Sequence, residues 1–213
     1  MPLFYQQDIN ETTRLGVWKI EEEEDFFLRE VPIHRAITHP HKKLQHLAGR
    51  YLLKLFFPDF PYELIRIADT RKPFLHNEQY HFSISHSGDY AAAIVSADRR
   101  VGIDVESYSD KVMKVLHKFL SPPEMELMLK HDSSPYVRET LLWSAKESVF
   151  KWHGLGGVDF REHIHIRSLR YAEGTDQPFL ACTFSGQPAA ELDLQYRLFD
   201  EVCLSWVISD HTA

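Results

Sequence analysis

Three short segments carry charged and hydroxyl side chains at spacings that suit metal or phosphate chemistry. The first is Gly-Ile-Asp-Val-Glu at residues 102–106. On a strand, alternate side chains share a face, so Asp104 and Glu106 point one way while Ile103 and Val105 point into the core. Two carboxylates on one face repel each other unless a cation lies between them, and Mg²⁺ prefers such oxygen ligands. Taken alone, the pattern also fits an exposed edge with two solvated acids.

The second segment is Trp-Ser-Ala-Lys-Glu-Ser-Val-Phe-Lys at residues 143–151. Glu147 and Lys151 lie four residues apart and are neighbours on a helix, with Lys146 beside them. A surface ion pair of little energetic value is one interpretation. The apolar neighbours favour a partly buried face, where a charged pair is costly without a ligand. One carboxylate and two ammonium groups would suit a metal-bound diphosphate.

The third segment is His-Phe-Ser-Ile-Ser-His-Ser-Gly at residues 81–88. Ser85, His86 and Ser87 precede a glycine turn and could donate hydrogen bonds to a phosphate. A plain hairpin turn is the alternative. Upstream, Arg-Lys-Pro at residues 71–73 places two cations on a loop.

A long amphipathic helix followed by several strands is predicted twice along the chain. The first helix spans 40–57, with Thr38 as N-cap and Pro58 at its end, because its apolar residues recur with a period of 3.6. The strands expected after it are 64–68, 81–85, 90–97 and 101–105. The second helix spans 136–152 and ends before Gly154. The strands expected after it are 163–170, 179–184, 194–199 and 202–209.

This repeated order predicts an α+β fold made of two similar lobes, each a long helix packed on a mainly antiparallel sheet. We expect an N-terminal lobe over residues 1–105 and a C-terminal lobe over residues 106–213, related as a pseudo-dimer. The connecting segment 107–130 is expected to be mostly helical. The acidic run 21–25 is expected to be a solvated helix start, where carboxylates suit the helix dipole.

Composition excludes several classes of protein. The chain has 213 residues and a formal net charge of −7, which argues against a general nucleic-acid binder. Cys182 and Cys203 are too few for a disulfide framework and are expected to be buried thiols. No apolar run reaches the length of a membrane helix, and residues 1–10 lack the pattern of a signal peptide. We therefore expect a cytoplasmic protein without a membrane or nucleic-acid partner.

Taken in order, the three segments resemble the 4′-phosphopantetheinyl transferases. The order is Lys-Pro, Ser-His-Ser, Gly-Ile-Asp-Val-Glu and Trp-Ser-x-Lys-Glu-Ser-x-x-Lys. The pattern is similar to the longer, two-lobed type, of which the activator of surfactin synthetase is an example. The resemblance covers nearly the whole chain from residue 40 onward. It implies a pseudo-dimer of two lobes with the active site between them.

The resemblance also implies an activity and its cofactors. Such enzymes are Mg²⁺-dependent, with Mn²⁺ as the alternative metal. They move the 4′-phosphopantetheine arm of coenzyme A onto a serine of an apo acyl or peptidyl carrier protein and release adenosine 3′,5′-bisphosphate. These carriers serve fatty acid, polyketide or nonribosomal peptide synthesis. An internal pseudo-dimer has less need of a partner copy, so we expect a monomer.

The resemblance assigns a role to each matching residue. The positions matching the acidic metal site are Asp104, Glu106 and Glu147. Lys151 matches a lysine near the reacting diphosphate, and Lys146 is expected to assist it. The positions expected to bind coenzyme A are Lys72, Pro73, Ser85, His86 and Lys151. His86 matches a histidine at the 3′-phosphate, while Lys72 and Pro73 match a loop that holds the adenine nucleotide.

One position departs from the family pattern. Members often carry an arginine early in the first long helix that reaches the 3′-phosphate, and Gln45 stands there in this sequence. Lys42, Lys43 and Arg35 are the candidate substitutes.

Two points of mechanism stay open at the level of sequence. The serine proton is expected to pass to Glu147, and a metal-bound water relayed through Glu106 is the alternative. A non-catalytic binder of a carrier protein or nucleotide, and a metal-dependent phosphohydrolase, are the competing functions.

A basic stripe is expected to receive the carrier protein. Lys111, Lys114 and Lys118 fall at i, i+3 and i+7 of a predicted helix that follows the Asp104 strand. Family members dock acidic carriers near this helix. A solvated helix face is the alternative.

Overall fold

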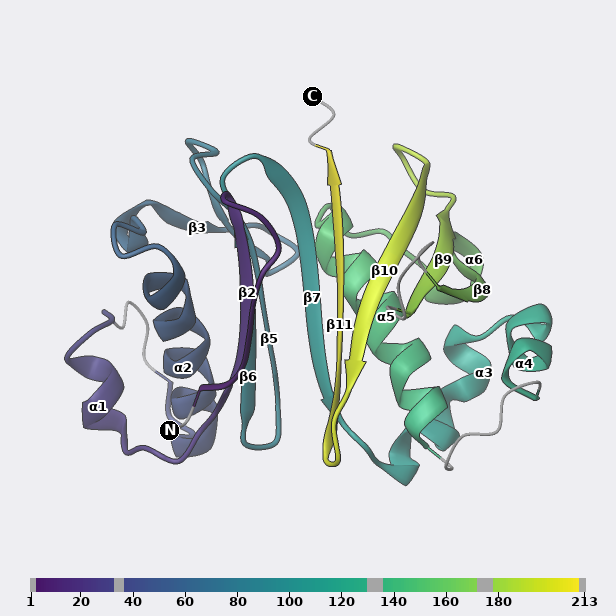
Figure 1. Cartoon of the computed structure of the whole chain (residues 1–213), viewed down its shortest axis with the longest axis horizontal. Coiled ribbons are helices and arrows are strands. Elements are labelled where there is room, and N and C mark those ends of the chain that lie inside the picture. Colours follow the sequence, from purple (N-terminus) through teal and green to yellow (C-terminus); the bar gives the residue numbers. More distant parts are fainter. Residues whose placement is uncertain (1–2, 33–36, 130–135, 172–177, 211–213) are drawn as a thin grey trace.

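The computed structural model describes residues 3–32, 37–129, 136–171 and 178–210. Two sheets face each other at the centre, and a long helix covers the outer face of each, so that four layers follow one another in Figure 1. Every strand pairing within the sheets is antiparallel. The predicted mixture of helices and mainly antiparallel sheets is confirmed. None of the described helices is long and apolar enough to cross a membrane.

The first sheet has the order β1-β2-β6-β5 and is covered by helix α2. Its strands are β1 (Leu3–Asp8), β2 (Thr13–Lys19), β5 (His81–Ser87) and β6 (Tyr90–Ser96). Helix α2 (Pro40–Phe56) confirms the predicted helix, although His39 rather than Thr38 is its N-cap. The short helix α1 (Glu24–Leu28) begins in the acidic run, as expected, and packs on α2.

The second sheet has the order β7-β11-β10-β9-β8 and is covered by helix α5. Its strands are β7 (Arg99–Ser107), β8 (Ile164–Tyr171), β9 (Pro178–Phe184), β10 (Ala190–Leu198) and β11 (Val202–Asp210). Helix α5 (Val137–His153) confirms the second predicted helix. Gly154 ends it with φ of +72°, a left-handed conformation that favours glycine. The described part of 107–130 is helical in short pieces: η2 (Asp110–Val115), α3 (Leu116–Phe119) and α4 (Pro122–Leu129).

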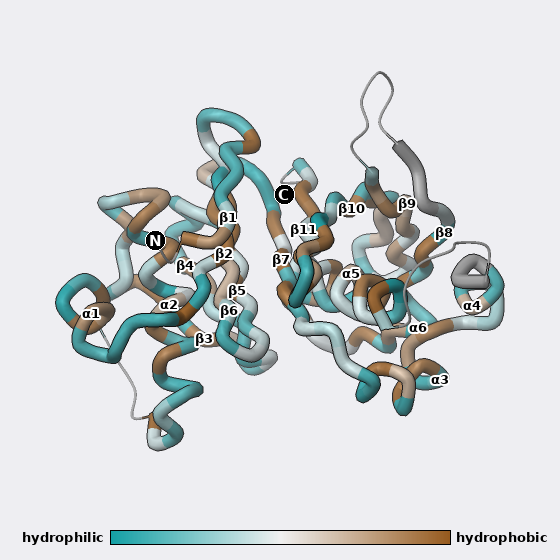
Figure 2. The backbone as a smooth tube through the Cα atoms, turned by 60° about the horizontal axis from the view of Figure 1, so that its bottom comes forward, coloured by the Kyte–Doolittle hydropathy of each residue, from teal (hydrophilic) through white to brown (hydrophobic). Residues whose placement is uncertain are grey.

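An apolar interface holds the two sheets together. Leu15, Val17 and Ile94 of the first sheet belong to the same buried cluster as Ile103 and Trp206 of the second. The hydrophobic stretches of β7 and β11 lie in the middle of the molecule (Figure 2). Strand β7 therefore pairs with β11 in the second sheet while packing against β5 of the first. The division of the chain at residue 105 stays a prediction, and that residue lies within β7.

Strands β1 and β2 were not predicted, and a small two-stranded sheet and two short helices complete the fold. The polar residues of Leu3–Asp8 and the central glycine of Thr13–Lys19 weaken the β signal of these segments. A small sheet pairs β3 (Ile65–Ile67) with β4 (Pro73–Leu75), and it follows the short helix η1 (Tyr62–Leu64). Helix α6 (Phe160–His163) leads into β8.

Gly102 lets α5 approach β7 unusually closely. A Cβ at this position would lie 2.1 Å from the carbonyl oxygen of Ser148 and 2.7 Å from the backbone nitrogen of Trp152. Any other residue would therefore push the helix away from the strand. The glycine of the Gly-Ile-Asp pattern thus has a packing role, which brings the next turn of α5 within reach of Asp104.

Candidate functional site

The centre of the candidate site joins one strand from each sheet to helix α5. Nζ of Lys151, on α5, donates to Oδ1 of Asp104 at 2.5 Å and to the hydroxyl of Ser85 at 2.8 Å. The Ser85 hydroxyl in turn donates to Oδ1 of Asp104 at 2.7 Å. Asp104 is only 2% exposed, so its charge is held inside the protein by these two partners. The structure thus brings together three of the predicted residues.

Serines of β5 also hold the second carboxylate of β7. The Ser87 hydroxyl donates to Glu106 at 2.8 Å, and the indole nitrogen of Trp143 donates to the same carboxylate at 3.3 Å. Because both strands alternate with a period of two, Ser85 meets Asp104 and Ser87 meets Glu106. In this structure both hydroxyls donate to the acids and fix their orientation. That they also donate to a phosphate stays a prediction.

Glu147 completes a group of three interacting acids. Burial raises the pKa of Glu147 to about 7, and the negative charges of Asp104 and Glu106 add to the effect. Burial and the charge of Asp104 also raise the pKa of Glu106. Lys151 opposes both shifts, so one ammonium group offsets only part of the repulsion among three carboxylates.

These acids have the donor chemistry that a hard divalent cation requires. Oδ2 of Asp104 is buried and has no hydrogen-bond partner among the described residues, so it has a lone pair to offer a ligand. Carboxylate oxygens are the usual protein ligands of Mg²⁺. Within the described ranges, however, no three His, Cys, Asp or Glu side chains are gathered closely enough to hold a metal ion. The three side chains have the oxygen ligands and the negative charge that Mg²⁺ requires. In this structure Lys151 forms an ion pair with Asp104.

His86 points away from the acids and lines a cavity of about 450 Å³. The same cavity is lined by His46 and Arg50 of α2 and by Arg66 and Arg71. Partial burial and the positive charge of Lys151 lower the pKa of His86. Of these basic residues only His86 and Arg71 were predicted from sequence. The spacing of His46 and Arg50, four residues apart on a predicted helix, was the available signal for these two, and Arg66 carried none.

Gln45 does not reach this cavity. Its amide donates to the carbonyl of Gly88 at 2.8 Å, and the side chain is 7% exposed. Of the predicted substitutes, Lys43 forms an ion pair with Glu24, and Arg35 lies outside the described residues. Lys42 is exposed, and its charge contributes to the lowered pKa of His86.

The Lys-Pro loop lies beside the centre of the site, and its predicted contact with the adenine nucleotide stays a prediction. Lys72 and Pro73 line a cavity of about 190 Å³ together with Ser83 of β5 and Lys151. Pro73 is the first residue of β4. A ligand in this cavity would lie next to the Lys151 ammonium group.

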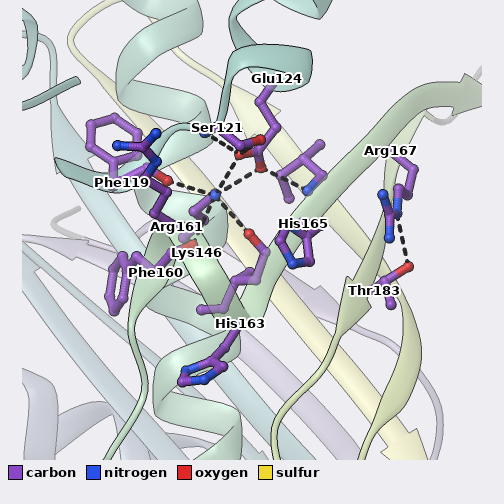
Figure 3. Close-up of polar contacts among 12 residues, drawn as sticks. Phe119, Ser121, Glu124, Lys146, Phe160, Arg161, His163, His165, Arg167 and Thr183 are labelled. Carbon is purple, nitrogen blue, oxygen red and sulfur yellow. Dashed lines mark hydrogen bonds and ion pairs between the residues drawn. The ribbon is translucent and has the colours of Figure 1, made fainter. Parts of the chain in front are cut away.

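Lys146, predicted to assist catalysis, belongs to a different part of the protein. It is fully buried, and Figure 3 shows its ammonium group where several polar contacts meet. It forms an ion pair with Glu124 at 2.8 Å and donates to the backbone carbonyls of Phe119, Phe160 and Ile164. Glu124 also accepts from the backbone nitrogen of Ser121. Successive helix residues point about 100° apart, so Lys146 is directed into the core beneath α4 and α6.

The predicted basic stripe is exposed but is not one helix face. Lys111 and Lys114 lie on the 3-10 helix η2, whereas Lys118 lies on the separate helix α3. The spacing i, i+3, i+7 therefore does not align the three side chains as it would on a continuous α-helix. Met113 between them is 43% exposed. Both cysteines are free and buried, as expected.

Comparison with known proteins relates this site to one family. A family model described as the 4′-phosphopantetheinyl transferase superfamily matches residues 100–204. The enterobactin synthase component D of Escherichia coli (strain K12) is 34% identical over 113 residues, which is 52% of this chain and 54% of the relative. A putative 4′-phosphopantetheinyl transferase of Haemophilus influenzae is 28% identical over 133 residues, covering 60% and 57% of the two chains. The chain thus spans about half the length of these relatives.

We expect Lys146→Met to destabilise the fold. The variant leaves Glu124 buried without its cation, which costs about 3–5 kcal/mol for a buried pair. Denaturant unfolding measures the change. Lys54→Met is the matched control, because its ion pair with Glu30 is partly exposed and should contribute about 1 kcal/mol or less. Wild-type stability of Lys146→Met would contradict the buried role.

We also expect the stability of the ligand-free protein to fall as pH rises from about 4.5 to about 7. The folded state holds a proton on Glu147 up to pH about 7, whereas the unfolded chain releases it near the ordinary value of 4.5. Over this interval the folded state binds more protons, so stability decreases with pH. Glu147→Gln removes this titrating carboxyl group. Denaturant unfolding at about pH 5 and about pH 8 should therefore show a smaller decrease for the variant, and an equal decrease would refute the shift.

Proposed function

We propose a transferase function on one premise: through residues 100–204, the chain belongs to the 4′-phosphopantetheinyl transferase superfamily. In this function the chain transfers the 4′-phosphopantetheine moiety of coenzyme A to a serine of an apo carrier protein and releases adenosine 3′,5′-bisphosphate. The observation that carries the proposal is the cluster of Asp104, Lys151 and Ser85 beside two further acids. Phosphoryl transfer requires such charge placement more than covalent chemistry by the protein.

The site residues divide the work of the reaction as follows. The serine oxygen of the carrier attacks the β-phosphorus of coenzyme A, and the bond from that phosphorus to the bridging oxygen breaks. Lys151 binds the diphosphate and offsets the charge that develops on the leaving bisphosphate. The carboxylate of Glu147 accepts the serine proton, directly or through a water, and a water relayed through Glu106 is the alternative acceptor. No protein nucleophile takes part.

A divalent cation fits the same proposal. Asp104, Glu106 and Glu147 would hold Mg²⁺, with Mn²⁺ as the alternative. When bound, the cation would neutralise diphosphate charge and act as a Lewis acid. Support comes from the unpartnered Oδ2 of Asp104 and from the mutual repulsion of the acids.

We further propose that the two halves of the chain form a pseudo-dimer with the active site between them. Each half places a long helix on an antiparallel sheet, which supports this arrangement. The site takes Ser85 from the first sheet and Lys151 from the helix of the second half. Lobes over residues 1–105 and 106–213 remain the proposed division.

The 3′-phosphate of coenzyme A is assigned to the cavity beside His86. Five cationic or titratable basic side chains line it, among them Arg50 and Arg71, and this charge supports a phosphate dianion. Glu63 also lines the cavity. These basic side chains take the place of the helix arginine, at whose position this chain has Gln45.

Two other functions are less well supported. A non-catalytic binder would not need three acids, and Asp104, Glu106 and Glu147 are all present. A phosphohydrolase would release phosphopantetheine to water without a carrier. Incubation of the protein with coenzyme A, Mg²⁺ and an apo carrier, followed by mass spectrometry of the carrier, separates the three functions.

We expect Glu147→Gln to lower transfer by about 10²–10⁴-fold, because the variant keeps the size of the side chain and loses the base. The carrier mass measures the rate. Glu162→Gln is the control, since this carboxylate is exposed and outside the site. Near wild-type turnover by folded Glu147→Gln, with Mg²⁺ as the sole metal, would falsify its catalytic role.

Dephospho-coenzyme A should be a poorer substrate than coenzyme A. A charge-assisted hydrogen bond contributes roughly 1.5–3 kcal/mol, or about ten- to a hundredfold in KM. His86→Ala should shrink the difference between the two substrates, and Lys54→Ala, on the same helix as Arg50 but outside the cavity, should not. If His86→Ala weakens both substrates equally, His86 has only a structural role.

We propose that an acidic carrier docks at the exposed lysines of η2 and α3. Lys111→Glu together with Lys114→Glu should raise the KM for the carrier several-fold and leave the KM for coenzyme A unchanged. The effect should fade between 0.1 M and 1 M salt, as the Debye length falls from about 10 Å to about 3 Å. Equal carrier KM values for variant and wild type at low salt would disprove the docking site.

A further inference from the structure

Gln45 is a buried polar residue of α2 that has no part in the proposed reaction. Its side chain is 7% exposed, and its amide nitrogen donates to the carbonyl oxygen of Gly88 at 2.8 Å. A carbonyl oxygen only accepts hydrogen bonds, so the nitrogen of the amide must face it. Because a buried amide is costly without a partner, this contact fixes the positions of both groups.

Gly88 belongs to the turn that joins the lower ends of β5 and β6 in Figure 1. The residue before it, Ser87, is the last of β5, and its hydroxyl donates to Glu106 at 2.8 Å. The same hydroxyl oxygen accepts from the backbone nitrogen of Ser107 at 3.1 Å. Both partners of Ser87 belong to β7. The turn is therefore held from two sides, by α2 at Gly88 and by β7 at Ser87.

A second side chain of α2 reaches the same carbonyl oxygen. Nε2 of His41 lies 2.9 Å from the oxygen of Gly88 and 3.8 Å from a carboxylate oxygen of Asp89. The His41 side chain is 41% exposed, so water competes for its contacts. The Gln45 amide is shielded from water, and its hydrogen bond therefore constrains the turn more firmly.

The position of the turn decides whether Ser87 can reach Glu106. Gly88 follows Ser87 directly, and the planar peptide bond between them transmits any displacement of the turn to the serine. Hydroxyl hydrogen bonds span about 2.5–3.0 Å, so a shift of about half an ångström would weaken the contact with Glu106. Trp143 is the other donor that the described residues give this carboxylate, at the longer distance of 3.3 Å. Ser87 is therefore the closer of the two donors that orient Glu106.

We propose that Gln45 is a positioning residue for Glu106 and acts through Gly88 and Ser87. It holds the β5–β6 turn against α2, so that the Ser87 hydroxyl keeps the Glu106 carboxylate oriented. This inference rests on the proposed function, in which Glu106 helps to hold a divalent cation. Hydrogen-bond partners of a metal ligand change metal affinity by about 10–100-fold when they are removed.

Amide hydrogen exchange at Ser107 tests the contact directly, because this backbone nitrogen donates to the Ser87 hydroxyl. Ser87→Ala removes the acceptor and gives the exchange rate for complete loss. We expect Gln45→Met, which keeps the length of the side chain and loses the donor, to speed exchange at Ser107 toward that rate. The amide of Leu194, in the core strand β10, should exchange as in wild type. Gln6→Met, at an exposed amide of β1, is the matched control and should change neither rate.

Mn²⁺ affinity tests the consequence for the site. Electron paramagnetic resonance measures free Mn²⁺ in a titration of the intact protein with one equivalent of coenzyme A and no carrier, so that transfer is not the readout. We expect binding to weaken about tenfold in Ser87→Ala and about threefold in Gln45→Met, which acts at one further remove. In the Ser87→Ala background, Gln45→Met should add little, because both residues act on one carboxylate through the same contact.

Two sets of results would overturn the proposal. Wild-type exchange at Ser107 in Gln45→Met, or equal acceleration at Leu194, would show that Gln45 does not specifically hold the turn. Unchanged Mn²⁺ affinity in Gln45→Met, or fully additive effects of the two substitutions, would show that Gln45 does not act on Glu106 through Ser87. If the wild-type protein binds no Mn²⁺, the proposed cation site fails instead, and exchange at Ser107 still decides whether Gln45 holds the turn.

Discussion

The close contact between α5 and β7 is the constraint on which the candidate site depends. At Gly102 the helix backbone replaces the missing side chain, and a Cβ would overlap the Ser148 carbonyl. Ser148 and Ser144 continue the contact through hydrogen bonds to Ser205 of β11. Small residues on both elements thus let the backbone of the helix approach the sheet closely. Only at this separation can Lys151 reach Asp104.

Electrostatic balance in the site follows from that geometry. Asp104 interacts electrostatically with Glu106 and Glu147, while Lys151 provides the one ion pair with Asp104 that the described residues show. Hydroxyl donors from β5 stabilise Asp104 and Glu106 without adding positive charge. The mutual repulsion of the acids contributes to the raised pKa values of Glu106 and Glu147, and a cation placed among them would relieve it.

Two lysines of the Trp-Ser-x-Lys-Glu-Ser-x-x-Lys segment serve opposite purposes. Lys146 is saturated by Glu124 and three carbonyls, and it ties α5 to α4, α6 and β8. The ammonium group of Lys151 donates to Ser85 and to Asp104 at the junction of the two sheets. The first fixes the helix in the lobe, and the second is available to a ligand. A pattern of residues can therefore combine packing and chemistry on neighbouring positions.

The sequence by itself determined the two long helices, most strands, the antiparallel α+β class and the pairing of Asp104 with Glu106 on one face. These features follow from local periodicity, which needs no knowledge of distant residues. Tertiary structure alone decided that Ser85 and Ser87 donate to the acids and that Lys146 is buried. It also decided that Arg50 and His86 line the same cavity. The same holds for β1 and β2, whose local signal is weak. Each of these depends on which elements pack together, and spacing along one element does not contain that information.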